Sequence, residues 1–284
     1  MKTKDYIMAK DGFVGHLYQP ENQKDRAVVV ILGGEQSLMP AKYVAQRFAD
    51  YGIMAVTVAL FGAEGLPEGV NLIPLEMAAK AVVELKKRGA KQIAVYGMSM
   101  GSIAAAYAAK YIPDIDTVIM CSPSHAAFEG TVDKKHMSGH SMLTWMGEEL
   151  PFVKPDFTHK KMYQAFKDAY QDKVLEEKAA IPIEQLKARL LFIASEGDES
   201  WPAAYSVGYM KERLTKNNYA YPFKVLLFKE SGHLIGIMPK KEEHKWLYRL
   251  MPLTYARERK NRKACDQARL ETEKAIIDWI MSEE

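Results

Sequence analysis

The most constraining feature of this chain is a regular alternation between short apolar runs and longer segments of helical period. The short runs are rich in β-branched residues and apolar at successive positions, which is typical of parallel strands buried on both faces. We predict strands at 27–32, 53–60, 92–96, 117–121, 190–194 and 223–228, and helices between them at 40–51, 74–88, 99–111 and 202–217. This order predicts an α/β protein with a mainly parallel, doubly wound sheet.

Three segments lie outside this alternation. Residues 11–20 precede the parallel run and are predicted as an antiparallel edge strand, and residues 258–280 are predicted as a final helix. Residues 131–180 lack a convincing strand pattern but contain helical material. Long excursions between sheet elements of compact enzymes usually build lids or binding surfaces. We therefore predict one domain, 1–284, with a helical cap inserted at 131–180.

Composition narrows the class of protein. The 284 residues are 48% hydrophobic and 26% charged, which is typical of a folded globular protein. A net charge of +3 is too small to indicate that the whole molecule binds nucleic acid or a membrane surface, so neither partner is expected. The only two cysteines, Cys121 and Cys265, exclude a disulfide scaffold and fit a reducing compartment.

The N-terminal residues do not have the pattern of a secretory signal. They are charged, and no apolar stretch follows them. The longest apolar runs are also well short of the roughly 18 to 20 residues that a membrane-spanning helix needs. The sequence therefore predicts a cytoplasmic protein.

The chemistry is concentrated in the Gly-Met-Ser-Met-Gly motif at 97–101. It follows a predicted strand and opens a predicted alanine-rich helix, which is the context of a nucleophile elbow. Two glycines permit the tight turn that exposes the serine hydroxyl above the sheet. A flexible Gly/Ser turn is the alternative reading, but the strand and helix on either side favour Ser99 as a nucleophile.

A serine hydroxyl needs a base to take its proton and an acid to orient that base. His233 lies just after the last predicted strand, 223–228, where the catalytic histidine is expected. His125 follows an earlier strand, and the other five histidines lie before the elbow, in the insertion or in a late charged helix. Asp198 lies in the loop after strand 190–194, where Glu196 and Glu199 are rival carboxylates. The order Ser, Asp, His along the chain is the one expected when a nucleophile elbow comes first.

An oxyanion hole is expected to combine two backbone N–H groups, one of them from the residue after the nucleophile, Met100. Gly34, in the glycine pair after the first parallel strand, is our choice for the second, although a close-packing role is open to it. Glu35 beside an oxyanion would be unfavourable unless its side chain turned away or met a cation. His136 and His140 have no evident third ligand, so neither a metal site nor a cofactor is predicted.

These motifs carry a family resemblance. The chain resembles the C-terminal α/β-hydrolase domain of the acyl-CoA thioester hydrolase and bile acid-CoA:amino acid N-acyltransferase family. The resemblance covers about residues 27–236 and implies an α/β-hydrolase fold with Ser99 as nucleophile, Asp198 as acid and His233 as base. The matching blocks are ILGG at 31–34, LFGAEGLP at 60–67, IPLE at 73–76, YGMSMG at 96–101, CSPSH at 121–125 with EG at 129–130, IPIE at 181–184, GD at 197–198 with WP at 201–202, and GHLI at 232–235.

The departures from the family pattern bear on the expected reaction. The conjugating acyltransferase of the family is associated with a cysteine nucleophile, whereas this chain has Ser99, which favours hydrolysis. Many members have lysine after the nucleophile and more glycine in the oxyanion loop, where this chain has Met100 and residues 35–37. Mammalian members carry an N-terminal β-sandwich, and only about 26 residues precede the first parallel strand here.

The resemblance therefore implies a serine hydrolase that cleaves acyl-CoA thioesters to free acid and CoA. A carboxylesterase or small-peptide hydrolase, an acyltransferase to an amine acceptor, and a non-catalytic binding protein are the alternatives. Lys134 and Lys135 could face CoA phosphates, although surface lysines are usually just solvated. Six apolar residues of the insertion could line an acyl pocket or belong to the core: Met137, Met142, Leu143, Trp145, Met146 and Phe152.

Overall fold

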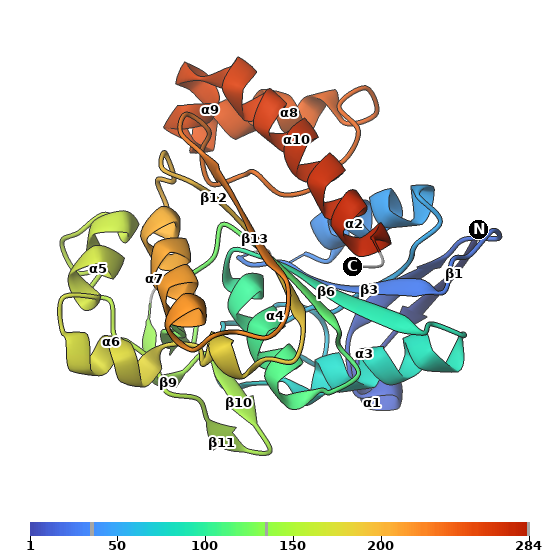
Figure 1. The fold of residues 1–284 in the computed structure, drawn as a ribbon, viewed down its shortest axis with the longest axis horizontal. Helices are drawn as coiled ribbons and strands as arrows, with labels where there is room; N and C mark the ends of the chain where they lie inside the picture. The colour runs from blue at the N-terminus through green and yellow to red at the C-terminus, as the bar shows by residue number, and fades with distance from the viewer. Residues whose placement is uncertain (35–36, 134–135, 283–284) are drawn as a thin grey trace.

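A single eight-stranded sheet forms the centre of the molecule in the computed structural model, which describes residues 1–34, 37–133 and 136–282 (Figure 1). Six neighbouring strands are parallel, and two antiparallel strands continue the sheet at one edge. In spatial order the strands are β1 (Lys2–Tyr6), β2 (Gly15–Gln19), β4 (Met54–Thr57), β3 (Arg26–Ile31), β6 (Gln92–Met98), β7 (Thr117–Cys121), β12 (Arg189–Ser195) and β13 (Phe223–Phe228).

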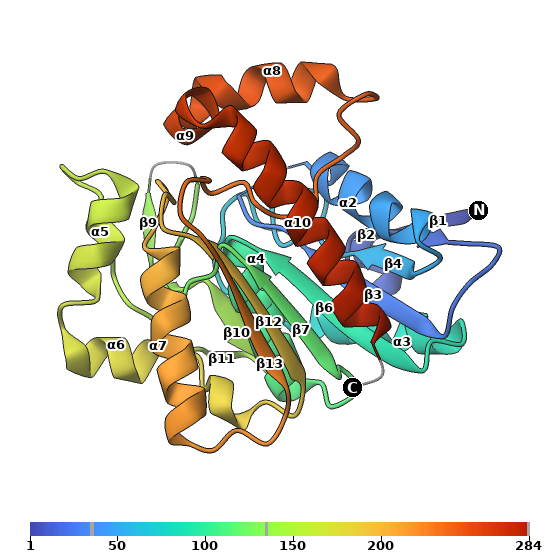
Figure 2. The same ribbon diagram turned by 45° about the horizontal axis from the view of Figure 1, so that its top comes forward.

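Helices cover both faces of this sheet, as Figures 1 and 2 show. One face packs against α2 (Met39–Asp50) and α10 (Arg262–Met281). The other packs against α3 (Glu76–Lys87), α4 (Met100–Tyr111) and α7 (Ala203–Lys216). The alanines of α4 are buried, and their small side chains let this helix lie close to the central strands. The predicted doubly wound, mainly parallel sheet is confirmed.

The edge of the sheet differs from the prediction. Residues 11–20 do contain an antiparallel strand, β2, but β1 pairs outside it and is the true edge. The sequence of β1 is mostly charged or polar, which conceals a strand but suits a solvent-exposed edge. The predicted helix at 74–88 begins at Glu76, because Ile73–Pro74 form the short strand β5.

The insertion at 131–180 is only partly helical, which corrects the prediction of a helical cap. Its second half forms α5 (Met162–Ala169) and α6 (Lys173–Ala179). Its first half forms strands, where Met146 and Gly147 both have positive φ, the geometry of a tight hairpin turn. These strands are β9 (Met137–Ser141), which pairs with β8 (Glu129–Thr131) at the entry to the insertion, and β10 (Leu143–Trp145), which pairs with β11 (Glu148–Glu149) and β5.

The remaining elements are short or lie near the C-terminus. The predicted final helix is α10, and the residues just before it form a separate short helix, α9. Among the described residues, no helix is both long enough and apolar enough to cross a membrane. The other elements are α1 (Met8–Asp11), a 3₁₀ turn at Ile183–Gln185, α8 (Lys245–Thr254) and α9 (Ala256–Lys260).

Candidate active site

Ser99 lies at the sharp turn between β6 and α4. Its backbone has φ 58° and ψ −129°, a strained conformation for a residue with a side chain. The turn is possible because of the glycines at both ends of the motif. A Cβ on Gly97 would lie 2.4 Å from the carbonyl oxygen of Gly101, and one on Gly101 would lie 2.1 Å from that of Ile31. The two glycines therefore let strand and helix meet and present the serine hydroxyl.

The structure brings Ser99, His233 and Asp198 together in a hydrogen-bonded chain. His233 Nε2 is 2.9 Å from Ser99 Oγ, and His233 Nδ1 is 2.8 Å from Asp198 Oδ2. The other carboxylate oxygen, Oδ1, accepts the backbone N–H groups of Ser200 and Trp201 at 2.8 Å and 3.3 Å. Both His233 and Asp198 are buried, so this row of hydrogen-bonded side chains is shielded from bulk water except at Ser99.

The rival carboxylates lie elsewhere. Glu199 accepts the backbone N–H of Arg257 at 2.9 Å, and Glu196 is exposed to solvent. Neither contacts His233, so Asp198 is the carboxylate that the fold brings to the histidine.

Two residues that sequence reasoning did not select hold His233 in place. Ser122 donates a hydrogen bond from Oγ to the carbonyl oxygen of His233 at 2.6 Å. The Trp201 ring lies edge-on to the imidazole, with 5.4 Å between ring centroids, and its Nε1 donates to the Ser122 carbonyl at 2.9 Å. Both residues belong to sequence blocks that resemble the family, and this resemblance was the sequence signal that could have pointed to them. Their contacts with His233, however, depend on the fold.

The glycine loop after β3 approaches the serine at Gly33 rather than at Gly34. A Cβ on Gly33 would lie 2.8 Å from Ser99 Cβ and 3.1 Å from the Met100 nitrogen. A Cβ on Gly34 would meet only the tip of the Met100 side chain, at 3.9 Å. Gly34 and Met100 both line the cavity beside Ser99, whereas Glu35 lies outside the described residues.

Ser99 and His233 open onto a cavity of about 1260 Å³. Much of its wall is apolar and comes from both the main domain and the insertion: Phe61, Val70, Phe128, Met137, Phe157, Met162, Phe166 and Trp201. Of the six insertion residues weighed as pocket or core, only Met137 lines this cavity. Met142, Leu143 and Phe152 belong to or pack against the core, Trp145 stacks on Tyr111, and Met146 is exposed.

Charged side chains also line the cavity. Four are carboxylates, namely Glu68, Glu129, Asp133 and Asp156, and two are lysines, Lys154 and Lys160. Lys160 also pairs with Asp168 at 2.8 Å, while Lys134 and Lys135 lie outside the described residues. Carboxylates thus outnumber lysines along the described part of the wall.

His136 and His140 lie in or beside β9 rather than on a helix face. Each bonds to a different carboxylate, Asp133 and Glu149 respectively, at 2.8 Å. Over 1–34, 37–133 and 136–282, no group of three or more histidine, cysteine or acidic side chains is arranged to hold a metal ion.

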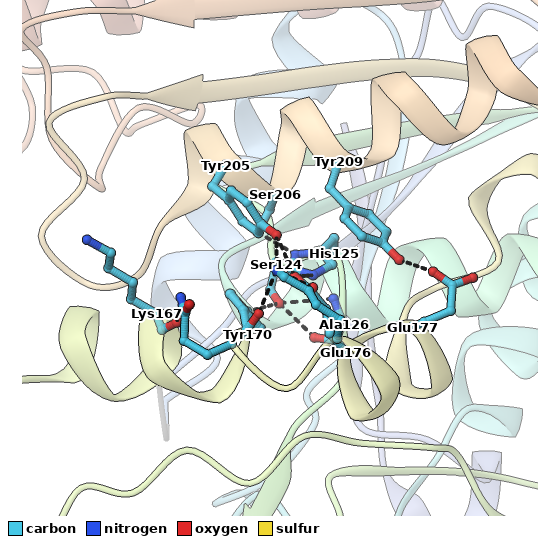
Figure 3. A network of polar contacts seen from close by, with 12 residues as sticks. Ser124, His125, Ala126, Lys167, Tyr170, Glu176, Glu177, Tyr205, Ser206 and Tyr209 are labelled. Atoms are coloured by element: carbon cyan, nitrogen blue, oxygen red, sulfur yellow. Dashed lines mark hydrogen bonds and ion pairs between the residues drawn. The ribbon is translucent and has the colours of Figure 1, made fainter.

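A second serine–histidine–carboxylate array lies inside the protein, between the insertion and α7 (Figure 3). His125 Nδ1 is 2.9 Å from Ser206 Oγ on α7, and its Nε2 is 3.1 Å from Glu176 Oε1 on α6. All three side chains are fully or almost fully buried. Glu176 also accepts hydrogen bonds from Lys173 and Tyr205, at 2.8 Å and 2.7 Å.

The environment of this array fixes its charges. Burial lowers the pKa of His125, aided by the positive charge of Lys173, and outweighs the opposite effect of Glu176, so the imidazole is neutral at neutral pH. Burial raises the pKa of Glu176, but hydrogen bonds from His125, Lys173 and Tyr205 outweigh this and lower it to about 2. The anionic carboxylate therefore accepts from Nε2–H of His125, and Nδ1 accepts from the Ser206 hydroxyl. The array fastens α6 to α7 and to the loop after β7.

A known protein family matches the part of the chain that contains Ser99, Asp198 and His233. Residues 71–244, more than half of the chain, match the family model described as BAAT / Acyl-CoA thioester hydrolase C terminal. The chain belongs to this family. This confirms the family resemblance inferred from the motifs.

Two curated relatives are acyl-CoA thioesterases. Human acyl-coenzyme A thioesterase 6 is 24% identical over 221 residues, 76% of this chain and 50% of the relative. Mouse peroxisomal succinyl-coenzyme A thioesterase is 25% identical over 199 residues, 68% of this chain and 45% of the relative. The chain thus spans about half the length of the curated relatives it matches.

Solved structures give the same fold at lower sequence identity. A thermostable carboxyl esterase from Bacillus coagulans aligns with a TM-score of 0.54 at 13% identity, over 83% of this chain and 92% of that one. An esterase domain from Rhodothermus marinus aligns with a TM-score of 0.50 at 12% identity, over 82% and 89% of the two chains. These likenesses show the α/β-hydrolase fold.

Proposed function

We propose that this protein is a serine hydrolase that cleaves acyl-CoA thioesters to a free acid and CoA. The observation that supports this most directly is the Ser99–His233–Asp198 chain at the edge of a large, mostly apolar cavity. The apolar wall suits an acyl group, and the hydroxyl beside it suits attack on the acyl carbonyl. The curated relatives are named coenzyme A thioesterases, which favours a CoA thioester as the substrate and CoA as the leaving group.

The mechanism has two acyl-transfer steps. Ser99 Oγ attacks the thioester carbonyl carbon while His233 Nε2 accepts the hydroxyl proton. The backbone N–H groups of Gly34 and Met100 stabilise the tetrahedral oxyanion. His233 then protonates the departing thiolate and later activates the water that releases the acid. Asp198, bonded to Nδ1, orients the ring and stabilises the imidazolium.

Hydrolysis is favoured over transfer to an amine because the nucleophile is serine. A serine acyl-enzyme is an oxygen ester, whereas a cysteine acyl-enzyme remains a thioester, which amines attack more readily. We therefore propose that water is the acceptor.

The insertion contributes Phe157, Met162 and Phe166 to the cavity wall, so we propose that it covers the acyl group. The two cysteines are free, which supports a reducing compartment such as the cytoplasm.

A second candidate is hydrolysis of an oxygen ester or a small peptide by the same three residues. The four carboxylates along the cavity favour it, because they repel the phosphates of CoA. This candidate differs from the first only in its leaving group.

A substrate panel separates the two. Purified protein is given acyl-CoA thioesters of graded chain length and aryl esters of the same acids, with free thiol and free phenol measured in parallel. We expect CoA release from some chain length, with no amide formed when glycine or taurine is added. Ester cleavage without any CoA release would favour the second candidate, and amide formation would contradict hydrolysis.

A further inference from the structure

The helix α8, just before the cavity-lining residue Tyr255, has an uncovered apolar face. Trp246, Leu250 and Leu253 are 55%, 50% and 78% exposed, and their spacing of four and three residues places them on one side of the helix. Tyr248 and Met251, on the opposite side, are buried against the body of the protein. A helix that is apolar on both sides normally has both covered. Its outer side therefore has the character of a docking surface.

The same region concentrates positive charge. Residues 240–263 contain nine lysines and arginines against three glutamates, a net of +6, so that the rest of the chain is net −3. Six of these cations are exposed and, within the described residues, form no ion pair: Lys245, Arg249, Arg259, Lys260, Arg262 and Lys263. The outer side of α8, with α9 and the start of α10, is thus a basic and apolar surface, which we call the α8 surface.

The α8 surface lies next to the candidate active site. Leu253 is two residues from Tyr255, whose ring lines the cavity and stacks on His233 with 6.2 Å between centroids. In Figures 1 and 2, α8 and α9 form a layer beyond one end of the central sheet, joined to it through α10. A partner bound to the α8 surface would therefore stand beside the cavity.

Charge decides which partner fits. A symmetric dimer through the α8 surface would place six cations against six, so self-association is opposed. An acidic partner is attracted instead. The described part of the cavity wall has the opposite character, with four carboxylates and two lysines, and so disfavours the several phosphates of CoA. The best match is a substrate whose acidic part stays at the α8 surface while a less charged arm enters the cavity.

We infer that the preferred substrate is an acyl thioester carried by a small acidic protein on a flexible phosphopantetheine arm, with the protein docked on the α8 surface. This rests on the thioester hydrolysis proposed above and names the carrier of the acyl group. Exposed Trp246, Leu250 and Leu253 supply apolar contact, and the surrounding cations supply charge complementarity. The arm then delivers the thioester to Ser99, and its free thiol leaves with the carrier.

The test compares one acyl group on two carriers, a bacterial acyl carrier protein and CoA, with the whole chain as enzyme. We expect kcat/KM for the protein-bound thioester to exceed that for the CoA thioester by about tenfold at low salt, a gap that closes as salt screens the charges. The double variant Lys245→Glu/Arg249→Glu should lose about tenfold on the carrier protein and change CoA thioester cleavage less than about twofold.

Lys211→Glu/Lys216→Glu, which reverses two exposed lysines of α7, is the charge-matched control and should leave both substrates unaffected. Equal kcat/KM for the two carriers, or an equal loss in both double variants, would overturn the inference. So would binding to vesicles of equal parts phosphatidylcholine and phosphatidylserine that the α8 variant loses, without any preference for the carrier protein, because the partner would then be a lipid surface.

A failure of the proposed function can be told apart from a failure of this inference. If no thioester is cleaved, binding of the acyl carrier protein is measured directly by titration. Binding that the α8 variant abolishes and the α7 variant retains would support the docking surface even though the reaction proposal had failed. Absence of binding would overturn the inference as well.

Discussion

The protein contains two serine–histidine–carboxylate arrays built from the same kinds of group. In one, His233 joins Ser99 to Asp198, and in the other His125 joins Ser206 to Glu176 (Figure 3). The two histidines use opposite ring nitrogens. Nε2 of His233 meets its serine, whereas Nε2 of His125 meets its carboxylate.

The arrays differ most in what surrounds the serine. Ser99 lies at a strained turn, beside a 1260 Å³ cavity and next to the backbone of Gly33. Ser206 lies within α7 and is fully buried. The same kinds of side chain therefore have different roles in the two arrays. The first array is suited to a reaction, while the second can only hold packed elements together.

Removing each serine hydroxyl in turn tests the difference between the two arrays most directly. Ser99→Ala should lower kcat by about 10³-fold or more, because the nucleophile is lost. Ser206→Ala should leave kcat within about twofold while costing about 1 kcal/mol of stability, because it removes one buried hydrogen bond. Initial rates on any cleaved substrate give kcat, and urea denaturation of both variants gives the free energy of unfolding. Similar rate losses in both variants would show that the buried array takes part in the chemistry.

Glu176 tests the structural role of the buried array. Glu176→Gln should lower the free energy of unfolding by about 1–3 kcal/mol, since three buried or partly buried donors lose a charged acceptor. Glu177→Gln is the matched control on the same helix. Glu177 is exposed and bonds Tyr209 and Arg213 at the surface, so its loss should cost about 0.5 kcal/mol or less. Equal losses would remove the special role given to the buried array.

The two arrays differ in how far the sequence alone predicts them. The parallel strands are buried on both faces, so they were recognisable as apolar runs, and the loop after each strand located Ser99, Asp198 and His233. His125 also follows a strand, but its partners are 51 and 81 positions away on α6 and α7. Only the packing of those helices against the loop reveals the array, and no local pattern encodes that packing.

Backbone geometry accounts for the other differences between the predicted and the observed structure. The first half of the insertion contains a hairpin turn with Met146 at φ 51°, and methionine is not a residue that signals such a turn. Within the Gly33–Gly34 pair, the sequence cannot tell which glycine approaches the serine, because both lack a side chain. The approach of Gly33 to within 2.8 Å of Ser99 Cβ follows from how β3 and β6 pair.

The smallest expected effect is a pH dependence that belongs to the buried array. Burial lowers the pKa of His125 in the folded protein below its ordinary value of about 6.5. Between the lowered value and about 6.5, the unfolded chain binds more protons than the folded one, so stability falls as the pH falls through this window. Glu176 acts in a separate window. Its pKa of about 2 means that its contribution is lost only as the pH falls from about 4.5 towards 2.

His125→Gln isolates the histidine, because an amide placed near Nε2 can still donate to Glu176 but does not titrate. Thermal unfolding at about pH 7 and about pH 5 should therefore show a larger drop in Tm for the unmodified protein than for this variant. Groups elsewhere titrate equally in both proteins and cancel in the difference. An equal drop in the two would mean that His125 binds its proton as readily in the folded protein as in the unfolded chain, which would contradict a sealed array between α6 and α7.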